Sequence, residues 1–387
     1  MTAIEERLRA LQPGEAIHIG HSFLVINVGG LKIALDPATE NGACAAPFSN
    51  LTPTARAQLR SYRALVTPDG IPSATELAQA VDVVLYSHIH TDHFNAAVLE
   101  KLMTANAHLQ VYWPQETPRV LFAPRLQLSR LGQRFLAWLD QFAWADHIPA
   151  GVREFCASMP PRLRLANTHE MADNDVKLLS HNPRIELRAF EVRHPRPLLW
   201  VRSPFEAATP PVLGYEIRYA EQGVPKRILL IGETSTDPEV LYRIWQARQE
   251  LVGLFVPVDE WLKLPGLRWL YDVYFHASPR LLALAERLAG ERATIHGLHH
   301  GLWLYQLNAA ELELGREALN RRVARPANAE EVTARLTESR AARHFGLRAL
   351  HKLERLVEAI SGFAPHSTPK VRLNPLGRPF RFGREAA

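Results

Sequence analysis

Three histidines and one aspartate lie within six positions of the stretch VLYSHIHTDHF, residues 84–94. His88 and His90 would project to the same side if the preceding strand continues through them, because side chains alternate along an extended chain. Asp92 and His93 follow in a loop, where the turning chain can aim a second pair of ligands at a nearby point. Crowded imidazoles are unfavourable once protonated, unless a metal ion or a carboxylate draws them together. The spacing H-x-H-x-D-H therefore predicts a metal site.

The cysteine count restricts the ligands that such a site can use. Cys44 and Cys156 are the only two cysteines in the 387 residues. Two are too few for a disulfide framework or for a zinc site built from cysteines. Any metal would therefore be bound by histidine and carboxylate side chains.

Composition and charge set the wider class of protein. The chain is 47% hydrophobic, enough to bury a substantial core. Its net charge of +5 comes from basic residues spread from Arg7 to Arg384 without a dense block, which argues against a nucleic-acid partner. Glu5, Glu6 and Arg7 interrupt the place of a secretory signal, and no run of about 18 apolar residues follows. We expect a cytoplasmic protein without a transmembrane segment, and the sequence leaves open a homo-oligomer.

The elements that must position the histidines are short strands mixed with helices. Residues 16–37 read as strands joined by a hairpin turn at Gly29-Gly30, and 81–87 reads as a buried strand directly before His88. Helical patterns follow the motif and begin again after Asp237 and near Ser278. Further strands are expected at 109–113, 185–194, 212–219, 226–232, 251–258 and 292–297. The chain is therefore predicted to be a mixed α/β protein.

Two regions stand apart from this pattern. Residues 114–184 contain several prolines and a helical stretch, and we expect them to form an insertion. Residues 308–387 are first helix-rich and then rich in proline and glycine. The predicted organisation is a catalytic domain at 1–307, with the insertion, followed by a helical extension and tail at 308–387.

The stretch SHIHTDH resembles the H-x-H-x-D-H signature of the metallo-β-lactamase fold superfamily. The segment GHSFLVINVGGLKIALDP resembles the opening of the branch with ascorbate-6-phosphate lactonases and N-acyl-phosphatidylethanolamine phospholipase D. The resemblance covers about residues 15–115 and 185–305. It implies an α/β fold of four layers, an αββα sandwich, with one or two metal ions at the edge of the sandwich.

The resemblance also implies ligands further along the chain. His194 resembles the third histidine of the superfamily, and Glu233 stands where Gly-Asp-Thr is usual and this chain has Gly-Glu-Thr. Glutamate can bridge two metals as aspartate does, or its extra methylene could displace one ion, so one metal and two metals both stay open. His296 is our choice for the last ligand, with His299 and His300 as alternatives.

Two further residues could act behind the ligands. Asp36 ends the strand IALDP, where its carboxylate could orient a ligand imidazole through the other ring nitrogen or could simply prepare the turn at Pro37. His21 could likewise support a ligand or be packed. The predicted metal ligands are His88, His90, Asp92, His93, His194, Glu233 and His296.

Metal-assisted hydrolysis is the chemistry that the resemblance implies. One ion would be held by His88, His90 and His194, and a second by Asp92, His93 and His296, with Glu233 between them. A bound divalent ion lowers the pKa of its water to about 7, which supplies hydroxide at neutral pH.

Asp92 and His93 are the catalytic candidates, and Asp92 would also orient or deprotonate the attacking water. The predicted cofactor is two Zn²⁺, with Mn²⁺ or Fe²⁺ as substitutes. The predicted substrate is a small or lipid-like anion with a phosphodiester, phospholipid or lactone-type ester bond. The alternatives are a mononuclear iron oxygenase of the same fold and a non-catalytic binding protein that retains the fold.

Overall fold

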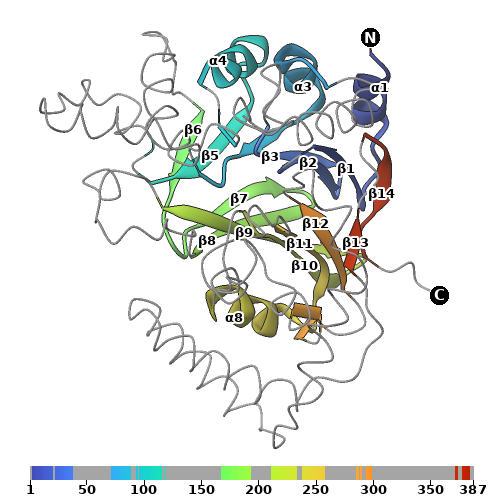
Figure 1. Ribbon diagram of the computed structural model, residues 1–387, viewed down its shortest axis with the longest axis vertical. Helices are drawn as coiled ribbons and strands as arrows, with labels where there is room; N and C mark the ends of the chain where they lie inside the picture. The colour runs from blue at the N-terminus through green and yellow to red at the C-terminus, as the bar shows by residue number, and fades with distance from the viewer. Residues whose placement is uncertain are drawn as a thin grey trace, which may run out of the picture. The chain divides into compact units, whose positions relative to one another are not determined.

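The described part of the chain builds two seven-stranded sheets. The ribbon of the computed structural model shows their strands and the described helices (Figure 1). The structure describes residues 2–20, 22–37, 71–88, 93–94, 96–115, 117, 167–192, 211–232, 238–257, 285–286, 288–289, 293–298, 371–373 and 377–383. The helices are α1 (Ala3–Ala10), α3 (Ala74–Ala80), α4 (Ala96–Ala105) and α8 (Pro238–Ala247). The strands of the first sheet are β1 (Glu15–Gly20), β2 (Phe23–Val28), β3 (Leu31–Leu35), β4 (Val83–Leu85), β5 (Gln110–Pro114), β6 (Thr168–Met171) and β14 (Pro379–Arg381). Those of the second are β7 (Val176–His181), β8 (Arg184–Val192), β9 (Val212–Glu221), β10 (Val224–Leu230), β11 (Leu251–Pro257), β12 (Thr294–Leu298) and β13 (Val371–Leu373).

The chain divides into two compact units. The first unit comprises Met1–Ala172, Val201–Pro211 and Pro375–Pro379. The second unit comprises Asp173–Trp200, Val212–Asn374 and Phe380–Ala387. The division into a domain at 1–307 and an extension at 308–387 stays a prediction. Within the described ranges, no helix combines the length and hydropathy that a membrane crossing needs.

The first sheet has the order β14-β1-β2-β3-β4-β5-β6. Strands β1 to β3 are antiparallel, whereas β3 to β6 run parallel. The predicted hairpin is confirmed: Val28 pairs with Leu31, and Gly29 and Gly30 between them have φ of 59° and 98°. Positive φ at both central residues is the requirement of the tight turn that matches the twist of a hairpin, and glycine meets it without steric cost.

The core of the first unit lies between its sheet and helices α1, α3 and α4, whose apolar side chains form one cluster with those of β1 to β5. Helix α3 begins at a capping box in which Ser73 accepts from the Glu76 amide and the Glu76 carboxylate accepts from the Ser73 amide. This reciprocal pair satisfies two donors that the helix itself leaves without a partner. The motif region is thus carried by a rigid, buried scaffold.

The second sheet repeats the arrangement in the order β13-β12-β11-β10-β9-β8-β7. Strands β7 to β10 are antiparallel and β10 to β13 are parallel. Helix α8 packs on it and shares a buried apolar cluster with β8, β10, β11 and β12. Phe190 lies so close to Gly214, its cross-strand partner, that a Cβ there would meet the Phe190 ring at 2.5 Å.

Four strands lie where the sequence did not predict them. Strands β6 and β7 fall in the range that was expected to be an insertion, and β13 and β14 fall in the expected C-terminal extension. All four lie at the ends of the two sheet orders, all except β7 are three or four residues long, and no residue of β7 is buried. Such strands are defined by the neighbour with which they pair rather than by their own composition, so a sequence pattern does not reveal them.

Candidate metal centre

The centre is built where two neighbouring parallel strands end. Leu35 of β3 pairs with Leu85 of β4, so the residues that follow them meet at the same edge of the first sheet. The Asp36 amide donates to the Leu85 carbonyl at 2.8 Å, and Asp36 has a φ of 45°. A left-handed conformation is tolerated by aspartate, and here it ends the strand and turns the chain. Asp36 and Ser87 are thereby brought together across 51 residues of sequence.

The Asp36 carboxylate is buried and accepts three hydrogen bonds. Its Oδ1 accepts from the Ser87 amide at 2.7 Å. Its Oδ2 lies 2.7 Å from the Ser87 hydroxyl and 2.8 Å from Nδ1 of His93. Asp36, Ser87 and His93 are all fully buried within the described structure. A buried carboxylate is stabilised by such donors, so Asp36 serves as the acceptor on which this part of the motif converges.

The Ser87 hydroxyl extends this network to His88. Its Oγ lies 2.9 Å from Nδ1 of His88. A hydroxyl can donate one hydrogen bond, and the carboxylate of Asp36 can only accept, so the Ser87 hydroxyl donates to Asp36. His88 must then donate from Nδ1 to the Ser87 oxygen, which is an assignment made from the hydrogen-bond network.

The hydrogen bond to Asp36 likewise places a proton on Nδ1 of His93. Because Oδ2 of Asp36 accepts, Nδ1 of His93 is the donor. A neutral imidazole with its proton on Nδ1 has its lone pair on Nε2. The two rings lie side by side, with centroids 4.1 Å apart and planes inclined by 49°. Both histidines therefore adopt the tautomer in which Nε2 can bind a metal ion.

Aromatic side chains pack together next to the histidine motif. Tyr86 packs edge to face on Phe94, with ring centroids 4.8 Å apart, and Phe94 in turn packs near Trp113. Burial, and then the negative charge of Asp36, raise the pKa of the Tyr86 phenol well above its usual range. Tyr86 therefore stays neutral and contributes packing rather than proton transfer at this position.

Several predicted site residues lie outside the described residues. These are His90, Asp92, His194 and Glu233, together with His21 and the alternatives His299 and His300. The described structure brings His88 and His93 together through Asp36 and Ser87. Asp36 takes the orienting position that was one of its two interpretations.

No role was predicted for Ser87, although its position in the sequence marks it. It is the polar residue that ends the apolar run VVLY, immediately before the first histidine.

His296 lies further inside its strand than expected. The strand was expected at 292–297, but β12 continues to Leu298, and His296 pairs with Phe255 of β11. Its Nε2 lies 2.8 Å from the Thr294 hydroxyl, and its ring stacks on Phe255 at 4.9 Å between centroids. Its role as the last ligand stays a prediction.

The residues present fit a metal ion by the chemistry of their donors. Metal-binding histidines usually donate their second ring nitrogen to a carboxylate or another acceptor, which fixes the tautomer and the ring orientation. His93 does so directly to Asp36, and His88 does so through Ser87. Imidazole nitrogens of this kind suit Zn²⁺, and also iron or other first-row divalent ions.

The comparisons with known proteins bear on the same segment. Residues 17–194 match the family model described as "Beta-lactamase superfamily domain". The matched range begins in β1, contains Asp36, Ser87 and the histidine motif, and ends at His194. None of the curated proteins matches the chain.

Among solved structures, the chain is similar to isothiocyanate hydrolase from Delia radicum gut bacteria, with 13% identity and a TM-score of 0.47 over 95% of this chain and 99% of that chain. It is also similar to unliganded yeast PDE1, with 12% identity and a TM-score of 0.45 over 96% and 100%. A third is a possible metal-dependent hydrolase from Veillonella parvula DSM 2008, with 10% identity and a TM-score of 0.44 over 80% and 94%.

Proposed function

We propose that this chain, a member of the metallo-β-lactamase fold superfamily through its domain at residues 17–194, is a metal-dependent hydrolase. The family match confirms the superfamily that the motif SHIHTDH indicated, and with it the predicted α/β fold class. The narrower branch, with its lactonases and phospholipases, stays a prediction.

One observation carries the proposal. The buried Asp36 and Ser87 hold His88 and His93 by their Nδ1 atoms. A metal site requires adjacent imidazoles that are held in the same tautomer. An apolar core has no need of two buried imidazoles side by side. We propose as ligands the full set of His88, His90, Asp92, His93, His194, Glu233 and His296.

Each described residue has a defined part in such a site. When bound, a divalent ion lowers the pKa of its water to near neutrality and polarises the bond to be broken. Asp36 and Ser87 hold the imidazoles in the binding tautomer and remove the need to reorganise them. Asp92, which lies outside the described residues, would orient the attacking water or take its proton. We propose two Zn²⁺, with Mn²⁺ or Fe²⁺ as substitutes.

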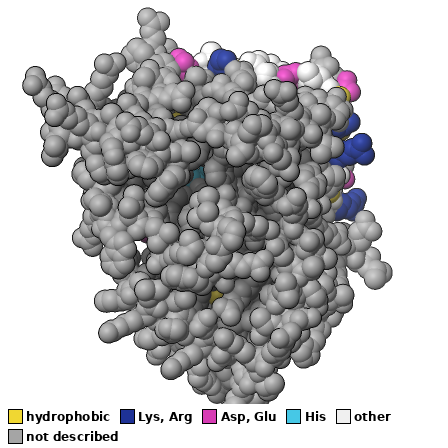
Figure 2. Space-filling model, in the orientation of Figure 1, with side chains coloured by type: hydrophobic (Ala, Val, Ile, Leu, Met, Phe, Trp, Pro, Cys, Tyr) yellow, Lys and Arg dark blue, Asp and Glu magenta, His cyan; other side chains and the backbone are white. Residues whose placement is uncertain are grey.

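We infer a small or lipid-like anionic substrate with a phosphodiester, phospholipid or lactone-type ester bond. A metal site stabilises the negative charge that develops on the attacked group of each of these. Nucleic acid fits less well. The basic residues are spread from Arg7 to Arg384 without a dense block, and the few described Lys and Arg side chains in Figure 2 lie at the edge of the view together with Asp and Glu.

Metal content per chain is the first test. The protein is purified without added metal and analysed by elemental analysis beside the double variant His88→Ala, His90→Ala and the single variant Glu233→Ala. We expect about two zinc or manganese ions in the natural chain and at most one in each variant. Hydrolysis of a chromogenic phosphodiester, a chromogenic lactone and phospholipid vesicles should fall at least a hundredfold in the double variant, because the ligands of the first ion are lost.

His108→Ala is the matched control, since His108 is exposed in the same unit. It should keep both metal content and rate. A folded double variant with full activity would rule out the metal assignment. A single iron with oxygen consumption would instead indicate the oxygenase, and a chain that binds no metal would leave the fold without the chemistry.

A further inference from the structure

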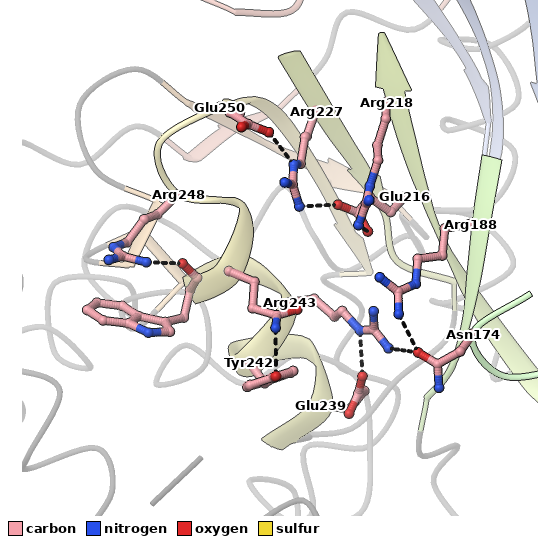
Figure 3. A network of polar contacts seen from close by, with 12 residues as sticks. Asn174, Arg188, Glu216, Arg218, Arg227, Glu239, Tyr242, Arg243, Arg248 and Glu250 are labelled. Carbon is pink, nitrogen blue, oxygen red and sulfur yellow. Dashed lines mark hydrogen bonds and ion pairs between the residues drawn. The ribbon is translucent and has the colours of Figure 1, made fainter. Parts of the chain in front are cut away.

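A group of guanidiniums lies on the face of the second sheet that helix α8 covers (Figure 3). Arg188 of β8 precedes Phe190 by two positions, so it faces the same side as this core residue. Arg218 of β9 and Arg243 of α8 point toward the same place, and Asn174 lies beside them. We call Arg188, Arg218, Arg243 and Asn174 the arginine cluster.

Glu216, a carboxylate beside the cluster, is already engaged by two guanidiniums. Oε2 of Glu216 lies 2.9 Å from Arg218, and its Oε1 lies 2.9 Å from Arg227. Arg227 also pairs with Glu250. Both oxygens of the buried Glu216 are thus taken, although Arg188 is its cross-strand partner.

Arg243 is buried and satisfied within its helix. Its Nε donates to Glu239, one turn earlier, at 2.6 Å, and its guanidinium lies 5.2 Å above the Phe190 ring. Its remaining contact is Nη2 to Oδ1 of Asn174 at 2.7 Å. Arg243 therefore has a charged partner of its own.

Arg188 differs from its neighbours. Its Nη2 donates to Oδ1 of Asn174 at 2.8 Å, the same neutral oxygen that Arg243 uses. Nη2 of Arg188 and Nη2 of Arg243 are thus at most 5.5 Å apart, the sum of 2.8 and 2.7 Å. In the described part of the chain, Arg188 has no ion pair within 4 Å, and the buried Nε atoms of Arg188 and Arg218 have no hydrogen-bond acceptor.

The electrostatic surroundings of Arg188 follow from this arrangement. Burial lowers the pKa of Arg188, and the charges of Arg243 and Arg218 lower it further, against weaker opposing effects of Glu216 and Asp173. Like charges this close repel strongly where water is partly excluded. The repulsion is relieved if an anion lies among the guanidiniums.

We propose that the arginine cluster binds a phosphate-like oxyanion. A guanidinium presents its donors as a planar fork that matches phosphate, and donors that arrive from two strands and a helix suit a tetrahedral anion better than a planar carboxylate. Arg188 is half-buried, so its side chain reaches the surface as well as the cluster. No member of the arginine cluster belongs to the proposed set of metal ligands, so the inference does not depend on the proposed hydrolase.

Titration with inorganic phosphate at constant ionic strength, with chloride as the replaced ion, tests the site. Binding to the full chain is followed by calorimetry and by the midpoint of thermal unfolding. We expect saturable binding in the natural chain and a Kd at least tenfold weaker in Arg188→Met, because one charged hydrogen-bonding group is removed. Arg184→Met is the matched control on the same face of β8, with its side chain 74% exposed, and should bind phosphate as the natural chain does.

Three further measurements distinguish phosphate held by the arginine cluster from phosphate held by a bound metal and from a purely structural arginine. Phosphate also binds metals, so the titration is repeated after chelation, where the loss of binding in the natural chain would overturn the proposal. Without phosphate, Arg188→Met should unfold at the same temperature or higher, since a repelled cation is removed; a clear decrease would indicate a purely structural role. If Arg188→Met does not fold, Arg188→Lys replaces it, and an unchanged Kd would contradict the role of the guanidinium fork.

Phosphoserine, titrated in the same way, distinguishes free phosphate from a phosphate ester on a larger molecule. Binding of both would indicate an ester-bearing ligand, and binding of inorganic phosphate only would indicate the free ion. Equal binding by the natural chain and Arg188→Met would show an adventitious ion only.

Discussion

The two units use buried charge in opposite ways. In the first unit, one carboxylate accepts three hydrogen bonds, and every described donor around it has a fixed direction. In the second, Glu216 serves two guanidiniums, and a third, Arg188, shares the neutral oxygen of Asn174 with Arg243. The first arrangement is complete around its anion, whereas in the described part of the second the buried Nε atoms of Arg188 and Arg218 have no hydrogen-bond acceptor.

This difference separates a site whose hydrogen bonds orient its metal-binding side chains from a site that we propose to bind a free anion. The Asp36 network determines where the protons of two imidazoles lie, and it does so without any bound molecule. The arginine cluster determines only that positive charge is concentrated. Substitution of Asp36 should therefore cost stability, whereas substitution of Arg188 should mainly change anion binding.

Removing the carboxylate of Asp36 should have the largest effect. Asp36→Ala deprives the Ser87 amide, the Ser87 hydroxyl and His93 of their acceptor. Each buried donor without an acceptor costs about 1–3 kcal/mol, and alanine adds about 1 kcal/mol at a φ of 45°. We expect a loss of about 3–5 kcal/mol in the free energy of unfolding, measured in urea.

Asp36→Asn separates charge from backbone strain. Asparagine tolerates the left-handed conformation but presents one amide group to the donors. It should lose less stability than Asp36→Ala, while metal affinity falls about 10- to 100-fold. Equal stability of the two variants would show that neither backbone strain nor the remaining amide acceptor matters here, and that the whole loss comes from the missing carboxylate.

An intermediate effect is expected at Glu216, and it should depend on pH. Burial tends to raise the pKa of Glu216, but the hydrogen bonds and charges of Arg218 and Arg227 outweigh burial and lower it overall. A lowered pKa means that the carboxylate stabilises the fold above its unfolded pKa of about 4.3 and that this contribution is lost as the pH falls through the lower folded value. Glu216→Gln should remove about 1–2 kcal/mol at pH 7, because its arginine partners are partly exposed.

Urea unfolding between pH 3 and pH 7 measures this difference. The natural chain and Glu216→Gln should converge in stability at the acid end of the range. Glu221→Gln, on the same strand in an exposed pair with Lys226, is the control and should change little at any pH. A constant gap between the natural chain and Glu216→Gln would contradict the role of ionisation.

The smallest effect is expected for Arg184→Met. Arg184 pairs with Glu186, but its side chain is 74% exposed. An ion pair in such surroundings contributes less than about 0.5 kcal/mol. A larger loss in thermal or urea unfolding would mean that the exposed end of this face is coupled to the arginine cluster.

Much of the fold could be predicted because its central strands have their own pattern. The buried run VVLY, the hairpin at Gly29-Gly30 and the strands at 212–219 and 226–232 are all present. The short strands β13 and β14 were not predicted, because each pairs with a strand that is distant in the sequence.

The candidate site was predicted as a list of ligands, and the sequence could not show how they are held. The spacing from His88 to His93 predicts a metal site, but the bond from His93 to Asp36 spans 57 residues. The sequence also could not show how far the strand that contains His296 extends. His296 lies two residues before the end of β12, in the interior of the strand.

The bond between the Ser87 amide and Asp36 also makes the first unit observable in time. It joins residues 51 positions apart, so it forms only after β3 and β4 have paired, and a long loop must close first. The Ser87 amide proton is then shielded from solvent exchange for as long as this pairing lasts. Its exchange rate measures how often the strand ends separate, and an ion bound by the two histidines would slow that exchange without contacting the amide.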